Sequence, residues 1–254
     1  MFKAKIYSLY VMEKYFALQE RFMDTVLYCS GITKSYGKKI ALEDVNLDVP
    51  KGSIVGLLGP NGSGKTTLLK IAAGLLTPTK GEIKICGLEP GAKSKNLLAY
   101  QPDKVYLNDW MNVADLFKMM EDFYSNFDMA KAKDMLKRLE INEKDKLKTM
   151  SKGTKEKVQL ITTMSRKVPL YILDEPIGGV DPAARDYILS TILSNYQDDA
   201  TIIISTHLIT DIESILNHVI FLKKGHIVRQ GNAEVIRAAE GKTIDGLFRE
   251  VFKC

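Results

Sequence analysis

A glycine-rich loop between an apolar strand and a helix constrains this fold more than any other feature of the sequence. Residues 53–58 (SIVGLL) predict a short buried strand, and residues 65–76 have the apolar spacing of a helix. Between them, residues 59–67 (GPNGSGKTT) match the phosphate-loop pattern GxxxxGK[ST]. The sequence therefore predicts an α/β fold that holds a nucleotide phosphate where this strand ends.

The residue types in this loop suit phosphate chemistry. Glycines let the backbone curl so that several N–H groups point at phosphate oxygens, and the following helix adds its positive N-terminal end. The ammonium of Lys65 can reach the β- and γ-phosphates, and the hydroxyl of Thr66 can ligate Mg²⁺. The residues expected to contact the nucleotide are Gly59, Asn61, Gly62, Ser63, Gly64, Lys65, Thr66 and Thr67.

Two acidic residues follow a second apolar strand. Residues 170–173 (LYIL) predict a buried strand, and Asp174 and Glu175 come directly after it. Downstream of a phosphate loop, Asp174 at the strand tip is expected to hold the Mg²⁺ shell. Glu175 is expected to orient the attacking water and to accept its proton. The loop and the two carboxylates together predict a site that hydrolyses a nucleotide.

The remaining elements are expected from periodicity. Strands are expected at 26–33, 45–49, 82–86, 201–204, 219–222 and 226–229, and helices at 184–196, 233–239 and 244–252. Alternating strands and helices in this part of the chain are typical of a parallel sheet covered by helices. Residues 111–139 have a helical period, and we interpret their apolar stripe as core packing. The stripe consists of Val113, Leu116, Phe117, Met120, Phe123 and Phe127.

Four further motifs stand in an order typical of one family. They are Tyr36 ahead of the phosphate loop, residues 150–155 (MSKGTK), residues 179–182 (GVDP) and residues 205–207 (STH). With them the chain resembles the nucleotide-binding subunits of ATP-binding cassette (ABC) transporters from about residue 27 onwards, roughly nine tenths of its length. MSKGTK is a variant of the family signature LSGGQ, with lysine third and threonine fifth.

The resemblance implies a fold and a division of the chain. The expected class is α/β, a P-loop NTPase with a RecA-like parallel sheet core, an antiparallel β subdomain and an α-helical signature subdomain at about 104–167. Residues 23–254 would form this ATPase domain. Residues 1–22 stand outside it as an extension with six aromatic residues. Two interpretations of the extension stay open: an amphipathic helix on a membrane or partner, or a mis-assigned start ahead of translation from Met23.

The resemblance also implies roles for single residues. Tyr36 would stack on adenine, and His207 would hold the γ-phosphate and the geometry of the attacking water. Ser151 and Gly153, at the start of a helix, would face the γ-phosphate bound to a second subunit, and Asp181 belongs to the neighbouring D-loop. Each ATP would then lie between the two chains of a homodimer, or of a heterodimer with another ABC ATPase subunit.

The implied partner is a separately encoded membrane permease, because no apolar run of the sequence approaches the roughly 18 residues that cross a bilayer. The ligands would be ATP and Mg²⁺, and the location peripheral, on the cytoplasmic face of the plasma membrane. The variant signature resembles most the ABC-2-type subunits that export drugs, peptides or lipids. The alternative is a soluble ABC ATPase in a non-transport assembly such as iron–sulfur cluster assembly. Direct nucleic-acid binding is not expected, because the basic residues form no stripe with interleaved aromatics.

One position departs from the family pattern. Family members carry glutamine in a segment of the form Tyr-x-Pro-Gln, whereas residues 100–103 read YQPD. This alignment places Asp103 at the glutamine position. A carboxylate there can ligate Mg²⁺ or orient water, and it adds a negative charge near the γ-phosphate.

Asp103→Asn is therefore expected to keep nucleotide binding and to change ATP turnover, because the substitution removes that charge and keeps the shape of the side chain. Steady-state kinetics measure both quantities as KM and kcat. Unchanged kinetics would place Asp103 outside the site.

Overall fold

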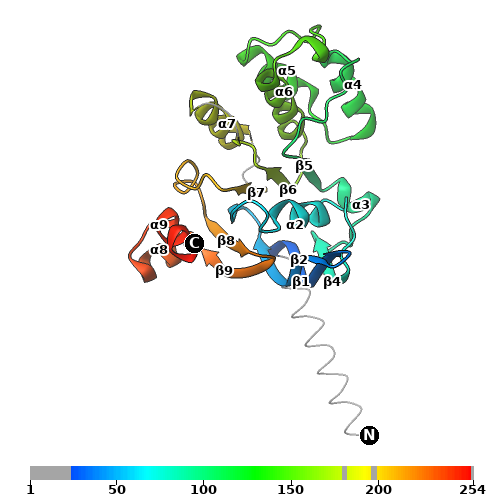
Figure 1. Ribbon diagram of the computed structural model, residues 1–254. Helices are drawn as coiled ribbons and strands as arrows, with labels where there is room; N and C mark the ends of the chain where they lie inside the picture. The colour runs from blue at the N-terminus through cyan, green and yellow to red at the C-terminus, as the bar shows by residue number, and fades with distance from the viewer. Residues whose placement is uncertain (1–23, 179–181, 196–198, 253–254) are drawn as a thin grey trace, which may run out of the picture.

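The computed structural model describes residues 24–178, 182–195 and 199–252, which form two sheets and a separate group of helices (Figure 1). The predictions made for residues 1–22 and for Asp181 lie outside the described residues.

The larger sheet has six strands in the order β5-β6-β7-β3-β8-β9. All neighbours in it are parallel except β8 and β9, which form a hairpin. This confirms the expected parallel core. Side chains of β6 alternate between two apolar clusters, with Leu170 and Ile172 on one face and Tyr171 and Leu173 on the other. Both faces are buried, which explains why the central strands read as apolar runs. The strands are β3 (Ile54–Leu58), β5 (Leu98–Gln101), β6 (Leu170–Asp174), β7 (Thr201–Thr206), β8 (His218–Lys223) and β9 (His226–Asn232).

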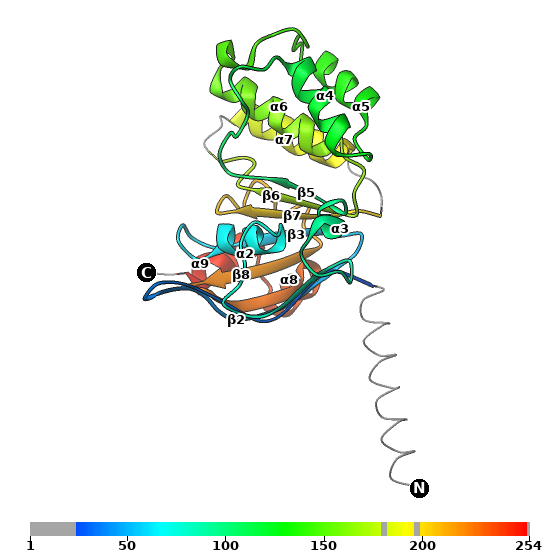
Figure 2. The same cartoon turned by 90° about the vertical axis from the view of Figure 1, so that its right-hand side faces the viewer.

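The smaller sheet is antiparallel and has the order β2-β1-β4. Its strands are β1 (Thr25–Tyr36), β2 (Lys39–Pro50) and β4 (Lys80–Ile85). Helix α2 (Lys65–Ala72) lies between this sheet and the parallel one, as Figure 2 shows. It buries Leu68 and Leu69 in an apolar cluster to which both sheets contribute.

Helix α2 is shorter than the expected 65–76, because the chain turns at Gly74 with a φ of +65°. Leu75 lies within the expected helix 65–76 but outside the observed one. It follows the helix and is 58% exposed.

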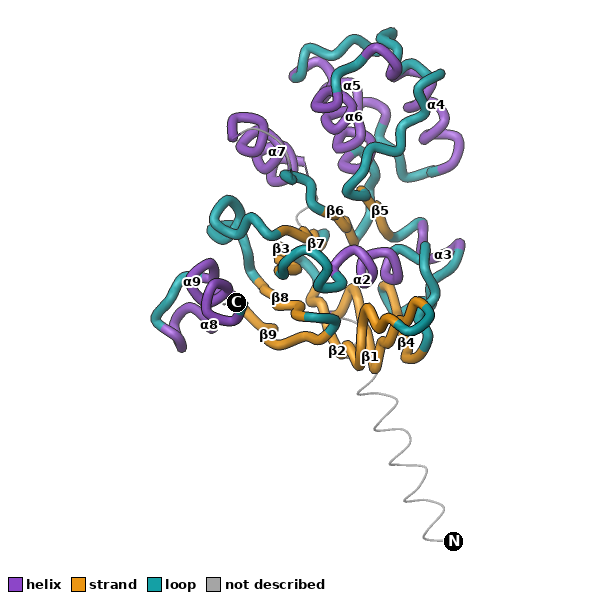
Figure 3. Tube along the Cα trace, viewed as in Figure 1, coloured by secondary structure: helices purple, strands orange, loops and turns teal. Residues whose placement is uncertain are grey.

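Three helices form a group at the top of Figures 1 and 3, and the last of them in the chain packs against β5 of the larger sheet. The helical stretch at 111–139 divides into α4 (Val113–Phe123) and α5 (Met129–Arg138). The division follows from two N-caps: the side chain of Asn112 accepts from the N–H of Asp115, and that of Asp128 from the N–H of Lys131. Helix α6 (Lys152–Met164) completes the group, preceded by the 3₁₀ turn η1 (Leu147–Thr149).

The apolar stripe of this region is buried with one exception. Val113, Leu116, Phe117 and Phe127 are in the core, and Met120 packs at its edge. Phe123 is 75% exposed, so its assignment to the core was wrong. The residue is the last of α4, where the helix ends.

The remaining helices are short or cover the sheet. Helix α3 (Ala92–Lys95) precedes β5, and α7 (Pro182–Asn195) joins β6 to β7. Helices α8 (Ala233–Glu240) and α9 (Ile244–Val251) follow β9, and Phe248 of α9 packs edge-on against Phe221 of β8. Among the described residues, none of the helices has the length and hydropathy needed to cross a bilayer.

Candidate functional site

A cavity of about 740 Å³ opens where β3 ends and α2 begins. The structure brings ten of the expected site residues into its wall. These are Tyr36, Asn61, Gly62, Ser63, Gly64, Lys65, Thr66, Thr67, Asp103 and Glu175. The cavity is therefore the candidate nucleotide site.

The backbone of the phosphate loop requires its glycines. Gly62 and Gly64 have φ angles of +80° and +112°, which side chains rarely tolerate. Gly59 lies beneath the loop rather than in the cavity wall, where a Cβ atom would stand 2.4 Å from the carbonyl oxygen of Leu222. Only glycine lets the loop approach β8 this closely.

Helix α2 begins at the loop without a side-chain cap, because its N-cap residue is Gly64. The first N–H groups of a helix have no partner within the helix. Here they face the cavity together with the positive end of the helix dipole, an arrangement that binds phosphate.

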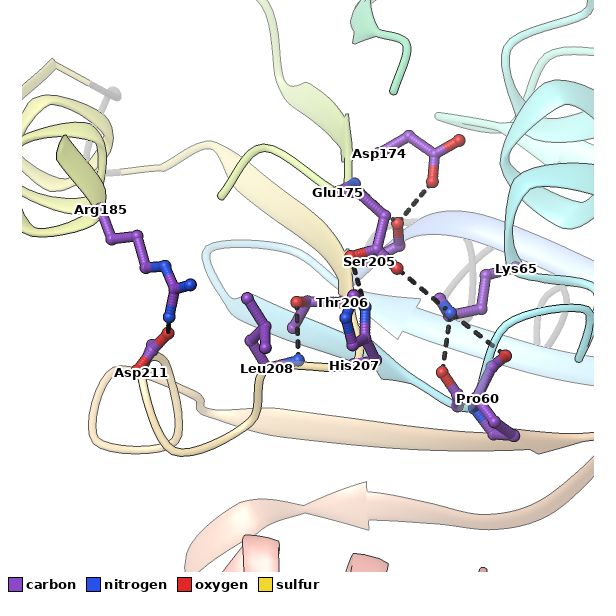
Figure 4. Close-up of polar contacts among 11 residues, drawn as sticks. Pro60, Lys65, Asp174, Glu175, Arg185, Ser205, Thr206, His207, Leu208 and Asp211 are labelled. Carbon is purple, nitrogen blue, oxygen red and sulfur yellow. Dashed lines mark hydrogen bonds and ion pairs between the residues drawn. The ribbon is translucent and has the colours of Figure 1, made fainter. Parts of the chain in front are cut away.

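Three charged or ionisable side chains, two of them in the cavity wall, form a chain of contacts at this edge of the sheet (Figure 4). The Nζ of Lys65, only 6% exposed, lies 3.2 Å from Oε1 of Glu175 and 2.7 Å from the carbonyl oxygen of Gly59. The other carboxylate oxygen of Glu175 lies 3.1 Å from Nδ1 of His207. Glu175 has a φ of +51°, a strained conformation for a residue with a side chain. The carboxylate is thus held between the phosphate-loop lysine and the histidine that follows β7.

Asp174 is fully buried at the end of β6. Ser205 Oγ donates to its Oδ1 at 2.5 Å, while Oδ2 has no hydrogen-bond partner among the described residues. Burial raises the pKa of the Asp174 carboxyl, the neighbouring hydroxyls of Ser205 and Thr66 oppose this, and the charges of Asp103 and Glu175 raise the pKa further. A bound cation would favour the ionised form.

The donor set around Asp174 fits Mg²⁺. The described residues contain no group of three or more His, Cys, Asp or Glu side chains arranged to hold a metal. Magnesium in nucleotide sites needs no such group, because it takes one or two protein oxygens and fills the other positions with phosphates and water. The unpartnered Oδ2 of Asp174, beside the Thr66 hydroxyl, supplies that kind of ligand.

Asp103 follows β5 and lines the cavity beside the loop. The buried hydroxyl of Tyr100 lies near both Asp103 and Asp174. Burial and these two carboxylates raise the pKa of the Tyr100 phenol, so that it stays protonated and able to donate. Gln101 is buried within β5 and does not line the cavity.

Two expected residues lie elsewhere. Ser151 caps α6, where its Oγ accepts from the N–H of Thr154 at 3.1 Å, and Gly153 lies in the first turn. Neither lines the cavity. Both are exposed, and a Cβ on Gly153 would meet nothing within 4 Å. This end of α6 is therefore open to another molecule.

Four cavity residues were missed from the sequence: Lys39, Ile40, Ala41 and Lys224. Lys224 stands at the tip of the β8–β9 hairpin, where the N–H of Gly225 donates to the Ser63 carbonyl at 2.8 Å. No local motif marks these residues, since they reach the loop only through the order of the strands.

Comparison with known proteins gives consistent results. A family model described as ABC transporter matches residues 42–178. The uncharacterised ABC transporter ATP-binding protein YhaQ of Bacillus subtilis is 31% identical over 222 residues, 85% of this chain and 74% of that protein. The lantibiotic transport ATP-binding protein SrtF of Streptococcus pyogenes is 29% identical over 205 residues, 80% of this chain and 89% of that protein. A solved structure of an ATP-binding subunit of an ABC transporter superposes with a TM-score of 0.81 at 29% identity, and covers 90% of this chain and 100% of that chain.

Proposed function

The chain belongs to the ABC transporter family as an ATP-binding subunit and an ATPase, and from that premise we propose that it powers a separate membrane permease by ATP-driven closure of a dimer. The observation that carries the proposal is the cavity in which Lys65, Glu175 and Asp103 meet the uncapped start of α2. Every group needed to bind and hydrolyse a nucleotide on one subunit stands in or beside this cavity.

The residues of the cavity take distinct roles in this proposal. Tyr36, half exposed at the cavity mouth, stacks on adenine. The loop N–H groups and Lys65 hold the phosphates, and Glu175 accepts a proton from the attacking water. His207 touches the second oxygen of Glu175 and orients it. When the nucleotide enters, Lys65 exchanges the Gly59 carbonyl and Glu175 for phosphate oxygens, which frees Glu175 to face the water.

Thr66, Asp174 and Asp103 would hold Mg²⁺ on the same side of the cavity. The cation supplies charge neutralisation at the β- and γ-phosphates. Ser205 fixes the Asp174 carboxylate through its 2.5 Å hydrogen bond, so that the unpartnered Oδ2 stays directed away from β7.

A second ATPase subunit completes the site. Ser151 and Gly153 stand at an exposed helix start outside their own cavity. Facing the γ-phosphate on a partner, they would add a hydroxyl and N–H donors to it. Asp181 would lie at the same interface. ATP then contributes contacts that exist only in the closed dimer, and hydrolysis removes them. The arrangement suits a homodimer and a heterodimer alike.

A groove beside the site offers a surface for the permease. It has a volume of about 550 Å³ and runs between the end of α2, β5 and α4. Leu75, Tyr106 and Phe123 line it and are all exposed apolar side chains. Exposed apolar residues gathered in one groove are typical of a protein contact. Pro102 lines the groove, and the next residue in the chain, Asp103, lines the nucleotide cavity. A partner bound in the groove would therefore contact the residue that precedes Asp103.

We propose export as the direction of transport; one of the relatives is named for the transport of a lantibiotic. A drug, peptide or lipid would be the cargo, and the permease would select it. The subunit would then sit peripherally on the cytoplasmic face of the plasma membrane.

Phe123→Asp is expected to reduce the share of the protein that sediments with washed membranes at least about fivefold, because it places a charge in an apolar contact. ATPase activity of the purified variant should stay within twofold of the parent. Val235→Asp is the matched control, since Val235 is 66% exposed on α8 and lies outside the groove. Equal membrane shares for the two variants would remove the groove from the proposal.

A further inference from the structure

Gln159 is a buried amide to which neither nucleotide binding nor hydrolysis assigns a role. It lies in the third turn of α6 and is 2% exposed. Its Nε2 donates to the carbonyl oxygen of Pro102 at 3.1 Å, and its Oε1 accepts from the N–H of Tyr106 at 3.2 Å. One side chain thus hydrogen-bonds the backbone on both sides of Asp103.

The segment that Gln159 holds forms no regular secondary structure. Residues 103–107 belong to no helix or strand. A second tie lies further along the same stretch, where Nζ of Lys155 approaches Oδ1 of Asp109 at 2.6 Å. Both ties come from α6, so this helix holds the segment at residues on both sides of its middle part.

Helix α6 also carries the signature. Ser151 caps its start, and Gln159 stands eight residues later, about 12 Å along the axis at 1.5 Å per residue. A regular helix moves as a unit over this length. The end that would meet the partner's nucleotide is therefore joined rigidly to the residue that grips the Asp103 segment.

We propose that Gln159 is a positioning residue that sets where the Asp103 carboxylate stands in the nucleotide cavity, and so links the signature end of α6 to that carboxylate. Pro102 and Tyr106, the two residues whose backbone it holds, also line the groove proposed for the permease. Gln159 therefore bonds the backbone of two groove residues that flank the cavity residue Asp103. The inference rests on the proposed role of Asp103 in that cavity.

The test begins with Gln159→Met, which keeps the side-chain volume and removes both hydrogen bonds. We expect kcat for ATP hydrolysis to fall about fivefold to tenfold, with KM for ATP within twofold, because the loss of two neutral hydrogen bonds misplaces Asp103 without touching the phosphate loop. Gln230→Met is the matched control: it makes the same change at an exposed residue of β9, whose side chain donates to the Asn46 carbonyl at 3.3 Å.

A double-mutant cycle separates positioning from general stability. If Gln159 acts through Asp103, adding Gln159→Met to Asp103→Asn lowers kcat by less than about twofold further. If the double variant instead lowers kcat by the product of the two single effects, the inference is overturned, because substitutions at independent sites contribute additively to the free energy of activation. Circular dichroism monitors folding. Gln159→Ala provides a second variant, because the space it leaves lets water reach the Pro102 and Tyr106 backbone.

The outcomes distinguish this inference from the proposed function. A folded Gln159→Met or Gln159→Ala protein with parental kcat would overturn the positioning role while Asp103→Asn still changes turnover. Parental kinetics of Asp103→Asn would instead remove Asp103 from the site, and the role of Gln159 with it.

Discussion

Replacing Glu175 by glutamine is expected to lower kcat for ATP hydrolysis by about 10²- to 10⁴-fold while ATP binding is retained, since this is the range that a general base contributes. The amide keeps the shape of the carboxylate and cannot accept the proton. In the structure the Glu175 carboxylate lies within 3.2 Å of Lys65 and 3.1 Å of His207. Single-turnover kinetics with excess enzyme measure the chemical step directly.

The same variant is expected to accumulate as an ATP-bound dimer with Mg²⁺, because closure is no longer followed by hydrolysis. Light scattering after size-exclusion chromatography measures the molar mass. Glu234→Gln, an exposed carboxylate in the first turn of α8, is the control and should keep parental turnover. If Glu175→Gln lowers kcat less than tenfold, another group accepts the proton.

Lys65→Ala is expected to weaken ATP binding by about 10- to 100-fold, because a charge-assisted hydrogen bond contributes roughly 1.5–3 kcal/mol. The Lys65 side chain is 6% exposed and lines the cavity. Equilibrium dialysis with labelled ATP measures the Kd. Lys144→Ala removes the same charge from an exposed loop and should leave the Kd unchanged.

Among the described residues, loss of Lys65 leaves His207 as the one ionisable side chain paired with the Glu175 carboxylate. Turnover at saturating ATP should therefore fall together with affinity. An unchanged Kd would show that the phosphates bind elsewhere and would contradict the assignment of the cavity.

The phosphate loop and the carboxylates of β6 could be predicted because each is a local pattern. A strand buried on both faces has to be an apolar run, and the polar residues that follow it have to stand at the sheet edge. The register of the sheet pairs Asp174 with Ser205, so Glu175 and His207 come directly after adjacent strand ends. Their 3.1 Å contact follows from that pairing.

Other features depend on strand order and on helix ends, which periodicity leaves open. Strand β5 (LAYQ) is short and half polar, and it becomes a strand by pairing with β6. Lys224 reaches the cavity because β8 lies beside β3. Leu75 and Phe123 have core spacing, but one follows the end of α2 and the other ends α4, and both are exposed. The two hydrogen bonds of Gln159 join residues more than fifty positions apart, and no local pattern marks them.

The most direct test of the account is to purify the tagged chain from detergent-solubilised membranes of the cells that make it, and to identify co-purifying proteins by mass spectrometry. The account predicts a membrane protein with several spanning helices, recovered in stoichiometric amount with the parent and in reduced amount with Phe123→Asp. Recovery of water-soluble partners alone, from a membrane fraction that contains the tagged chain, would contradict the permease and favour an ATPase of a non-transport assembly.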